Sequence, residues 1–432
     1  MRRLLQSTCL LFAILLFAGR IMADVATTPA SDPKETNDIK ETPTPAYLQS
    51  EPAPAAPATV IAGLRTWLDL YEAEANHPWP AFPEDTLLKP GMTDPLVVDL
   101  RQRLRETGDL AGWDSTSDQF DAPLKQAVKN FQQRMGLAAD GVVGAGTLRE
   151  LNVPPLDRAK QLAVNLVRWT ELGQKLGDRF VLVNVPDFHL FVYDHGQKVL
   201  DMKAIVGKRT RQTPEITSSI THIIFNPWWS VPQLIARRDI IPKILDDPDY
   251  LDRMHIRIFE SQENNAAQIP ENRVNWNQVA DNGFPWYFRQ DPGAQNALGK
   301  VKFEFQNSAS IYMHDTPTRD LFKQPVRLFS SGCIRLEKPL ALVEELMKTD
   351  SAFDEERLQS LLDRQKTVFI HVKTPTPVFI AYLTAWIDDR GRLNFRDDVY
   401  GRDDPDAPAI HQDGDPEPEE DDGDGNLDSQ QE

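Results

Sequence analysis

Hydrophobic residues recur with two different periods along this chain of 432 residues. Between residues 60 and 175 they are spaced three or four positions apart, which gives each run the apolar face of a helix. From Arg179 onward the spacing changes to two, which is typical of half-buried strands. The strand-like runs are residues 180–185, 190–193, 220–225, 301–305 and 367–372, and one more helix is expected near residues 338–347. The pattern predicts an α+β protein in which a small helical module precedes a β-rich domain.

The N-terminus has the composition of an export signal. Arg2 and Arg3 precede an apolar run over residues 10–18, and Ala23 is a small residue at which cleavage could follow. The run is short for a membrane-spanning helix. Residues 1–23 are therefore interpreted as a signal peptide or, if it is not cleaved, as a single membrane anchor.

Two further segments cannot form a hydrophobic core. Residues 24–59 contain seven prolines among Ala, Thr and Glu, which predicts an extended linker. Residues 397–432 hold fifteen acidic residues against one basic residue, and the part from 405 to 432 is expected to be a disordered tail. This tail supplies most of the net charge of −18, and an acidic chain of this kind is not expected to bind nucleic acid.

The residue types that commonly hold metals and nucleotides lack the usual spacing. The two cysteines form no CxxC pair, and none of the eight histidines occurs in an HExxH motif. Residues 293–301 resemble a phosphate-binding loop, but five residues separate the glycines and no Ser or Thr follows Lys300. We therefore expect neither a metal nor a cofactor.

The helical region contains a recognisable module. Residues 94–108 and 120–136 predict two amphipathic helices, and a turn at Asp140 is followed by a helix start near Thr147. The pair Phe131-Gln132 and the spacing Asp-Gly-x-x-Gly-x-x-Thr from Asp140 to Thr147 resemble the peptidoglycan-binding type 1 family. The alternative is a helical scaffold that binds nothing.

One cysteine would remain after export. Cleavage of the signal removes Cys9 and leaves Cys333 as the one cysteine. Thiols tend to form disulfides in an oxidising compartment, so a single unpaired cysteine there suggests a function. A cysteine nucleophile requires a base and an oxyanion hole. His314 lies nineteen residues earlier, and Gly332 lets the amides of Gly332 and Cys333 approach a substrate carbonyl closely. Arg335 can hold a carboxylate. The alternative is a buried apolar cysteine.

The region around this cysteine resembles the catalytic domain of L,D-transpeptidases (YkuD type). The family signature is a His, a short loop, and then Ser-His-Gly-Cys with an Arg two residues later. Residues 311–317 and 329–335 follow it, with Ser331 where the signature has His. The resemblance extends over residues 60–404 and is closest to the larger periplasmic, YcbB-like members. It implies a β-rich fold with an inserted substrate-capping segment.

The resemblance also implies a role for each residue near the cysteine. Cys333 would be the nucleophile and His314 its base, oriented by the backbone carbonyl of Ser331. Asp315 is not given that orienting role, because adjacent residues of a strand point to opposite faces. The expected catalytic residues are Cys333, His314, Gly332 and Ser331, and the expected substrate-binding residues are Arg335, Tyr312, Trp228 and Ser330.

The insertion is expected over residues 233–298, which lack strand alternation. Tryptophans in or beside it are candidates either for lining the cleft or for core packing. They stand at positions 228, 229, 276 and 286. His222 and His371 lie in apolar strands and are interpreted as structural.

The family implies an exchange of one amide for another in peptidoglycan. Cys333 would attack the bond between diaminopimelate and the terminal D-alanine of a stem tetrapeptide, releasing D-alanine and leaving a thioester. An amine on a neighbouring diaminopimelate would then form a 3-3 cross-link, without ATP or any cofactor. Peptidoglycan is thus the expected partner, nucleic acid is not, and the expected location is the periplasm of a Gram-negative bacterium.

Other functions remain open from the sequence. Water could take the acyl group, which would make the protein an L,D-carboxypeptidase, or the same site could cleave cross-links or attach and release a lipoprotein. A second alternative is a non-catalytic wall-binding scaffold. A serine hydrolase using Ser330 or Ser331 would lack the Gly-x-Ser-x-Gly elbow.

The expected organisation of the chain follows from these assignments. Its parts are a signal peptide or anchor at 1–23, a linker at 24–59, a helical preface at 60–92, a peptidoglycan-binding type 1-like module at 93–152, a connecting helix at 153–177, a catalytic domain at 178–374 with a capping insertion at 233–298, a C-terminal extension packing on the catalytic domain at 375–404, and an acidic tail at 405–432.

Overall fold

The computed structural model describes residues 53–76, 79–111, 116–263, 265–276, 278–279 and 283–404. The expected signal, most of the expected linker and the acidic tail lie outside these residues. Within the described part of the chain, no helix combines the length and the apolar character that crossing a membrane requires.

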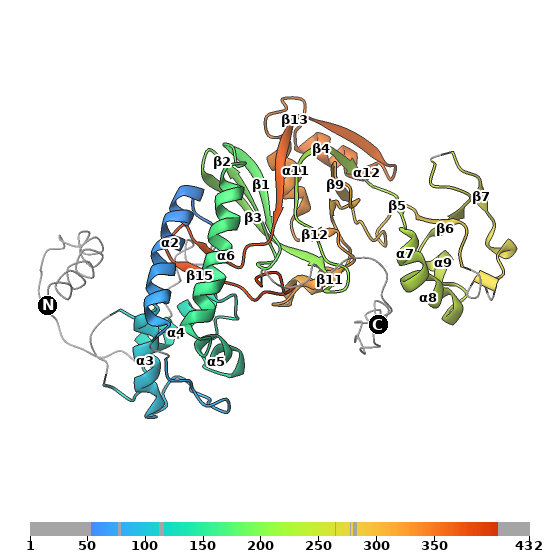
Figure 1. Cartoon of the computed structure of the whole chain (residues 1–432). Coiled ribbons are helices and arrows are strands. Elements are labelled where there is room, and N and C mark those ends of the chain that lie inside the picture. The colour runs from blue at the N-terminus through green and yellow to red at the C-terminus, as the bar shows by residue number, and fades with distance from the viewer. Residues whose placement is uncertain are drawn as a thin grey trace, which may run out of the picture. The chain divides into compact units, whose positions relative to one another are not determined.

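The N-terminal part is helical, as its period predicts (Figure 1). Its helices are α2 (Pro57–Glu74), α3 (Leu96–Glu106), α4 (Ala122–Arg134), α5 (Ala145–Leu151) and α6 (Pro155–Gly173). The long helices α2 and α6 lie side by side. Their apolar faces share one core with the shorter helices, in which Trp169 and Phe131 are almost completely buried. Burial of these stripes, rather than helix propensity, stabilises the module.

A side-chain network holds α4 against the turn that precedes α5. The amide nitrogen of Gln132 donates to Asp140 Oδ1 at 2.8 Å and to Thr147 Oγ1 at 3.0 Å. Its amide oxygen accepts from the backbone N–H of Gly141 at 2.8 Å. Gln132 and Thr147 are both buried, so these bonds satisfy polar groups that water cannot reach. The residues that carry the resemblance of this module therefore have a structural role.

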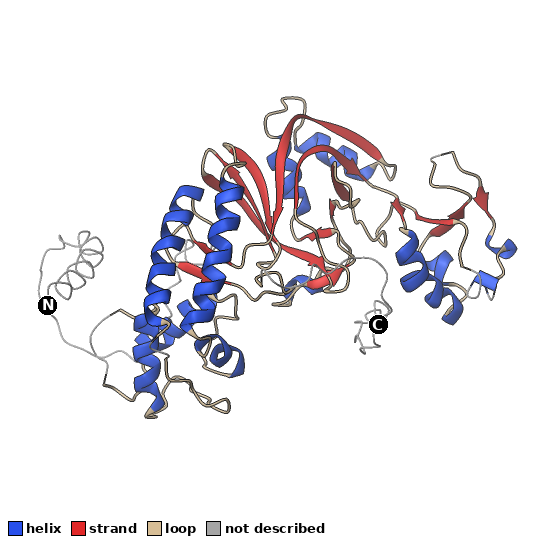
Figure 2. Ribbon diagram, viewed as in Figure 1, coloured by secondary structure: helices blue, strands red, loops and turns tan. Residues whose placement is uncertain are grey.

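The rest of the chain is built on one nine-stranded sheet (Figure 2). The strand order is β11-β3-β12-β10-β9-β4-β13-β1-β2, and β2 also pairs with β3, so the sheet closes on itself. The bounds are β1 (Arg179–Asn184), β2 (His189–Asp194), β3 (Gln197–Gly207), β4 (Ile216–Phe225), β9 (Val301–Phe305), β10 (Met313–His314), β11 (Leu328–Ser330), β12 (Ile334–Leu336) and β13 (Val368–Ala381).

Two helices complete the core of this sheet. They are α11 (Pro339–Met347), which matches the expected helix, and α12 (Glu355–Asp363). Leu342 and Leu361 are fully buried in the same core as Phe303 of β9 and Ile334 of β12. This core lies on one side of β9, β10 and β12. Because side chains alternate along a strand, every second side chain of these strands points to the opposite side.

The segment between β4 and β9 contains strands that the sequence analysis did not expect. Its strands β5 (Trp229–Ser230), β6 (Ile256–Phe259), β7 (Gln268–Ile269) and β8 (Tyr287–Gln290) form a separate four-stranded sheet. Its helices are α7 (Gln233–Ile235), α8 (Ile241–Asp246) and α9 (Tyr250–Arg253), with a π-helical turn at Ala236–Ile240 and a 3-10 turn at Glu271–Arg273. A second 3-10 turn, Asp320–Lys323, lies outside this segment and follows β10. The insertion has its own hydrophobic core. Strand β6 does alternate, with Ile256 and Ile258 buried, but four residues are too few to stand out.

The expected linker is wrong at its C-terminal end. Helix α2 begins at Pro57, Ala53 is completely buried, and the Tyr193 hydroxyl donates to the carbonyl of Pro54 at 2.6 Å. Proline is compatible with the first turn of a helix. The prolines of this stretch therefore led to a predicted extended segment that is too long at its C-terminal end.

The C-terminal extension packs on the helical module as well as on the central sheet. Residues 375–381 complete β13 in the central sheet. The hairpin β14 (Ala385–Ile387) and β15 (Leu393–Phe395) joins the core of the helical module, where the Trp169 indole donates to the carbonyl of Ala385 at 3.1 Å. The segment after β15 then reaches the nine-stranded central sheet, because the Tyr400 hydroxyl donates to the carbonyl of Gly207 at 2.6 Å.

Candidate active site

Four side chains in or directly before two neighbouring strands share one face of the central sheet. Strands β10 and β12 pair in parallel, with Met313 level with Ile334 and His314 level with Arg335. Met313 and Ile334 are fully buried in the core on one side of the sheet, so the residues next to them point to the opposite side. This alternation brings together the residues that we call the Cys333 cluster: Tyr312, His314, Cys333 and Arg335.

His314 is buried and oriented by a backbone carbonyl. Its Nδ1 lies 2.5 Å from the carbonyl oxygen of Asp315, so Nδ1 carries the proton and Nε2 keeps a free lone pair. The expected orienting carbonyl, that of Ser331, is therefore wrong. The carboxylate of Asp315 takes no part, as expected, because it accepts from the backbone N–H of Lys300 at 2.9 Å and from Arg319 at 3.0 Å.

Burial lowers the pKa of His314 to about 3, and the nearby positive charges of Arg335 and Lys302 lower it as well. The hydrogen bond to Asp315 acts in the opposite direction. The imidazole is thus neutral at physiological pH, which is the state that a general base requires.

The Cys333 thiol is half-buried and contacts Tyr312. Burial raises the pKa of the thiol, while hydrogen bonds from the backbone and hydroxyl of Tyr312 and the charges of Lys302 and Arg335 lower it. Burial also raises the pKa of the Tyr312 hydroxyl well above its usual range, and the thiol contributes to this increase. No hydrogen bond joins the imidazole to the thiol among the described residues. The resting site therefore contains a neutral thiol beside a neutral base.

Strand β9 adds a positive charge that the sequence analysis did not assign. Lys302 is level with His314, and its ammonium lies 4.2 Å from the centre of the Tyr312 ring. It also pairs with Glu304 at 2.8 Å. The alternation in residues 301–305 already places Lys302 and Glu304 on the polar face of their strand. It does not show that this strand pairs with the strand that contains His314.

Arg335 is the second cation of the site. Burial lowers the pKa of its guanidinium, and the Cys333 thiol acts in the opposite direction. Within the described residues it makes no hydrogen bond and no ion pair. A partly buried cation without a carboxylate is unfavourable. Its place beside the thiol makes it available to a carboxylate of a bound ligand.

The turn before Cys333 is stabilised from within. The Ser330 hydroxyl donates to the carbonyl of Cys333 at 2.5 Å and accepts from the backbone N–H of Gly332 at 3.2 Å. Ser330 is only 2% exposed, so its expected contact with substrate is wrong. The N–H of Gly332 is likewise occupied, and of the two amides expected to face an oxyanion only that of Cys333 lacks an acceptor in the described part of the chain.

Ser331 lies at the surface of this turn. Its hydroxyl accepts from Arg211 at 2.7 Å, and Arg211 also pairs with Asp239 of the insertion at 2.8 Å. The position where the family signature has His thus connects the turn to the insertion. No local pattern predicts this contact, because Arg211 and Ser331 are 120 residues apart.

The tryptophan that contacts the Cys333 cluster is Trp229 rather than Trp228. The side chain of Trp229 makes a hydrogen bond to the Tyr312 hydroxyl. Trp228 is 41% exposed and lies 5.1 Å from the guanidinium of Arg289 in the insertion. Trp276 and Trp286 pack against the core of the insertion. The expected role of Trp228 in binding substrate therefore has no support from its contacts.

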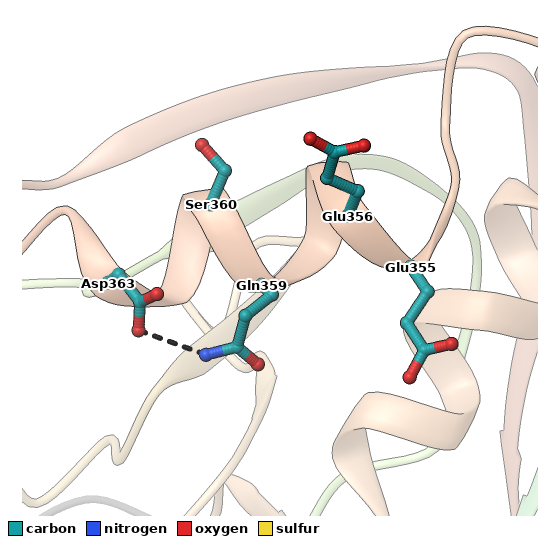
Figure 3. A pocket seen from close by; sticks show the side chains of 5 residues that line it. All are labelled: Glu355, Glu356, Gln359, Ser360 and Asp363. Atoms are coloured by element: carbon teal, nitrogen blue, oxygen red, sulfur yellow. Dashed lines mark hydrogen bonds between the residues drawn. The ribbon is translucent and has the colours of Figure 1, made fainter.

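The described residues contain no group of three or more His, Cys, Asp or Glu side chains placed to hold a metal ion. A shallow hollow lies along α12, where the Gln359 amide donates to Asp363 (Figure 3). Helix α12 packs on the core side of the sheet, so this hollow is separate from the Cys333 cluster.

Two family models match this chain. The model of the L,D-transpeptidase catalytic domain (YkuD) matches residues 178–380. The model described as "Putative peptidoglycan binding domain" matches residues 93–151. A Haemophilus influenzae protein named "Putative L,D-transpeptidase" is 35% identical over 223 residues, which are 52% of this chain and 44% of that protein. The match thus spans less than half the length of this relative.

Solved structures of L,D-transpeptidases are also similar at a low level. The protein from Xylanimonas cellulosilytica is 15% identical, with 70% of this chain and 100% of that chain covered and a TM-score of 0.22. The protein from Stackebrandtia nassauensis is 14% identical, with 70% and 97% covered and a TM-score of 0.25. At these TM-scores the assignment depends on the family models and the relative. The chain therefore carries an L,D-transpeptidase catalytic domain of the YkuD family behind a helical peptidoglycan-binding module.

Proposed function

We propose that this protein is a periplasmic L,D-transpeptidase that forms 3-3 cross-links in peptidoglycan through a thioester on Cys333. The observation that carries the proposal is the Cys333 cluster, in which a thiol, a neutral imidazole and an uncompensated guanidinium share one face of the sheet. These are the groups that acyl transfer to sulfur from an anionic peptide requires.

The first half of the reaction forms the thioester. His314 Nε2 takes the proton of the thiol, and Sγ attacks the carbonyl carbon of the bond between diaminopimelate and D-alanine. The backbone N–H of Cys333 donates to the resulting oxyanion. When the C–N bond breaks, His314 returns the proton to the amine of the departing D-alanine. Arg335 holds a carboxylate of the stem peptide in this step.

The second half transfers the acyl group. An amine of a second stem peptide attacks the thioester, His314 accepts its proton, and the thiolate leaves and is reprotonated. The new bond is again an amide, so no energy source is consumed. Attack by water instead would release a tripeptide and make the protein an L,D-carboxypeptidase.

The experiment is intact mass spectrometry of the full chain incubated with disaccharide-tetrapeptide, together with product analysis. We expect an acyl adduct on the peptide that contains Cys333, release of D-alanine and a dimeric 3-3 product. Cys333→Ala should fold, form no adduct and release no D-alanine.

Each other outcome has a distinct meaning. An adduct that resolves only to tripeptide would replace the transpeptidase by the carboxypeptidase. A thiol that reacts with iodoacetamide but never with the tetrapeptide would overturn the proposal. If Cys333→Ala kept full activity, the nucleophile would be wrong, and a serine in the same turn would have to be tested.

A further inference from the structure

The peptide unit between Gly332 and Cys333 is held from one side. Its carbonyl accepts a hydrogen bond from the Thr213 hydroxyl at 2.8 Å. The φ angle of Gly332 is +110°, a backbone conformation that a residue with a side chain rarely adopts. In a planar trans peptide the N–H points opposite to the C=O. Holding the carbonyl of Gly332 toward Thr213 therefore aims the N–H of Cys333 away from Thr213.

The direction of the bond from Thr213 is unambiguous. Its hydroxyl also accepts from the backbone N–H of Gly207 at 2.9 Å, so its single proton is left for the carbonyl of Gly332. Thr213 is completely buried, so water cannot replace either hydrogen bond if the hydroxyl rotates. Both bonds would be lost without the hydroxyl.

Thr213 is itself fixed by the segment after β15. The Tyr400 hydroxyl donates to the carbonyl of Gly207 and accepts from the backbone N–H of Thr213 at 3.3 Å. Arg402 donates to the Gln212 side chain at 2.6 Å and to the carbonyl of Thr213 at 3.3 Å. The loop from Gly207 to Thr213 is also tight, because a Cβ on Gly207 would lie 2.1 Å from the carbonyl oxygen of Arg211.

We infer that Thr213 is a positioning residue that aims the backbone N–H of Cys333 at the oxyanion of the acylation step. The inference depends on the proposed function, because it assumes that Cys333 is acylated. Thr213 does not touch the substrate; it acts through the Gly332–Cys333 peptide. The N–H that it directs has no acceptor within the described residues.

Two reactions of the same thiol separate this role from a merely structural one. Acylation by the tetrapeptide passes through an oxyanion and needs the directed N–H. Alkylation by iodoacetamide is a displacement at a saturated carbon, in which iodide leaves and no oxyanion forms. Loss of the Thr213 hydroxyl should therefore slow acylation and leave alkylation nearly unchanged.

The test uses the full chain with Thr213→Val, which keeps the shape of the side chain, and Thr213→Ser, which keeps the hydroxyl. We expect Thr213→Val to lower the rate of Cys333 acylation by about 10²-fold, the lower end of the loss when one oxyanion donor is removed. Alkylation should stay within about twofold, and Thr213→Ser should recover most of the acylation rate.

Several outcomes would overturn the inference. They are acylation of Thr213→Val at the wild-type rate, acylation and alkylation falling together, and a failure of Thr213→Ser to recover. If Thr213→Val does not fold, Thr213→Ala removes the hydroxyl without placing a methyl group against the carbonyl of Gly332 and gives the same comparison. A wild-type protein that alkylates but is never acylated would instead remove the proposed function, and this inference with it.

Discussion

The helical module and the catalytic sheet each contain a family signature, but the two signatures differ in what their side chains contact. In the module, Gln132 bonds to Asp140, Gly141 and Thr147, so the signature residues satisfy one another. In the sheet, Arg335 makes no hydrogen bond or ion pair among the described residues, and the Cys333 thiol stays half-buried against the core.

The difference separates residues that specify a fold from residues that perform chemistry. A buried polar network whose members bond to each other costs stability when it is broken, but it offers nothing to a ligand. A partly buried cation without an anion is unfavourable unless a ligand completes it, and titratable groups with shifted pKa values gather at functional sites. The match of residues 93–151 therefore supports a module of that fold.

The largest effect should come from His314. We expect His314→Gln to lower the acylation rate of Cys333 by about 10²- to 10⁴-fold, since a base in this position takes the thiol proton. The measurement is single-turnover mass spectrometry with the tetrapeptide. Wild-type acylation by the variant would mean that another group activates the thiol and would place His314 with the structural residues.

A smaller effect is expected at Arg335. Arg335→Ala should raise KM and lower kcat/KM by about 10- to 100-fold, because a charge-assisted bond to a carboxylate contributes about 1.5–3 kcal/mol. Alkylation of Cys333 should persist. The control is Arg357→Ala on the exposed side of α12. Loss of alkylation at Arg335→Ala would show that the guanidinium maintains the site rather than binding substrate.

The pH dependence of stability should also report on His314. Its pKa is about 3 in the folded protein against an ordinary value of 6.5, so the unfolded chain binds the proton first as pH falls. The stability due to the neutral imidazole is complete above pH 6.5 and is lost between pH 6.5 and pH 3. Urea unfolding at pH 7 and pH 4 should show a steeper loss for wild type than for His314→Gln. Equal slopes would contradict the burial of this side chain.

The smallest effect on activity is expected in the module. Gln132→Leu should lower the free energy of unfolding by about 1–3 kcal/mol, because it leaves buried donors and acceptors unpaired. Acylation by a soluble tetrapeptide should stay within about twofold, the range in which surface changes usually fall. The exposed Gln126→Leu on the same helix is the matched control. A large loss of acylation at Gln132→Leu would show that the two signatures are coupled.

Much of the fold follows from local pattern. The period of two places β1, β2, β9 and part of β4 and β13 correctly, and α11 begins at a proline suited to the first helical turn. The strands of the insertion were missed because they are two to four residues long. The contact of the hairpin β14–β15 with the helical module was missed because packing partners depend on contacts between distant segments.

The sequence by itself determined that Cys333 and His314 are the candidate nucleophile and base, and that Asp315 points away from the face of His314, because adjacent residues of a strand point to opposite faces. Only the tertiary structure decided that β10 and β12 lie side by side in parallel and in register, and that Thr213 meets Gly332. The orienting carbonyl of His314 was decided in the same way. Strand neighbours and peptide orientation are set by the packing of the whole core, and no local pattern encodes them.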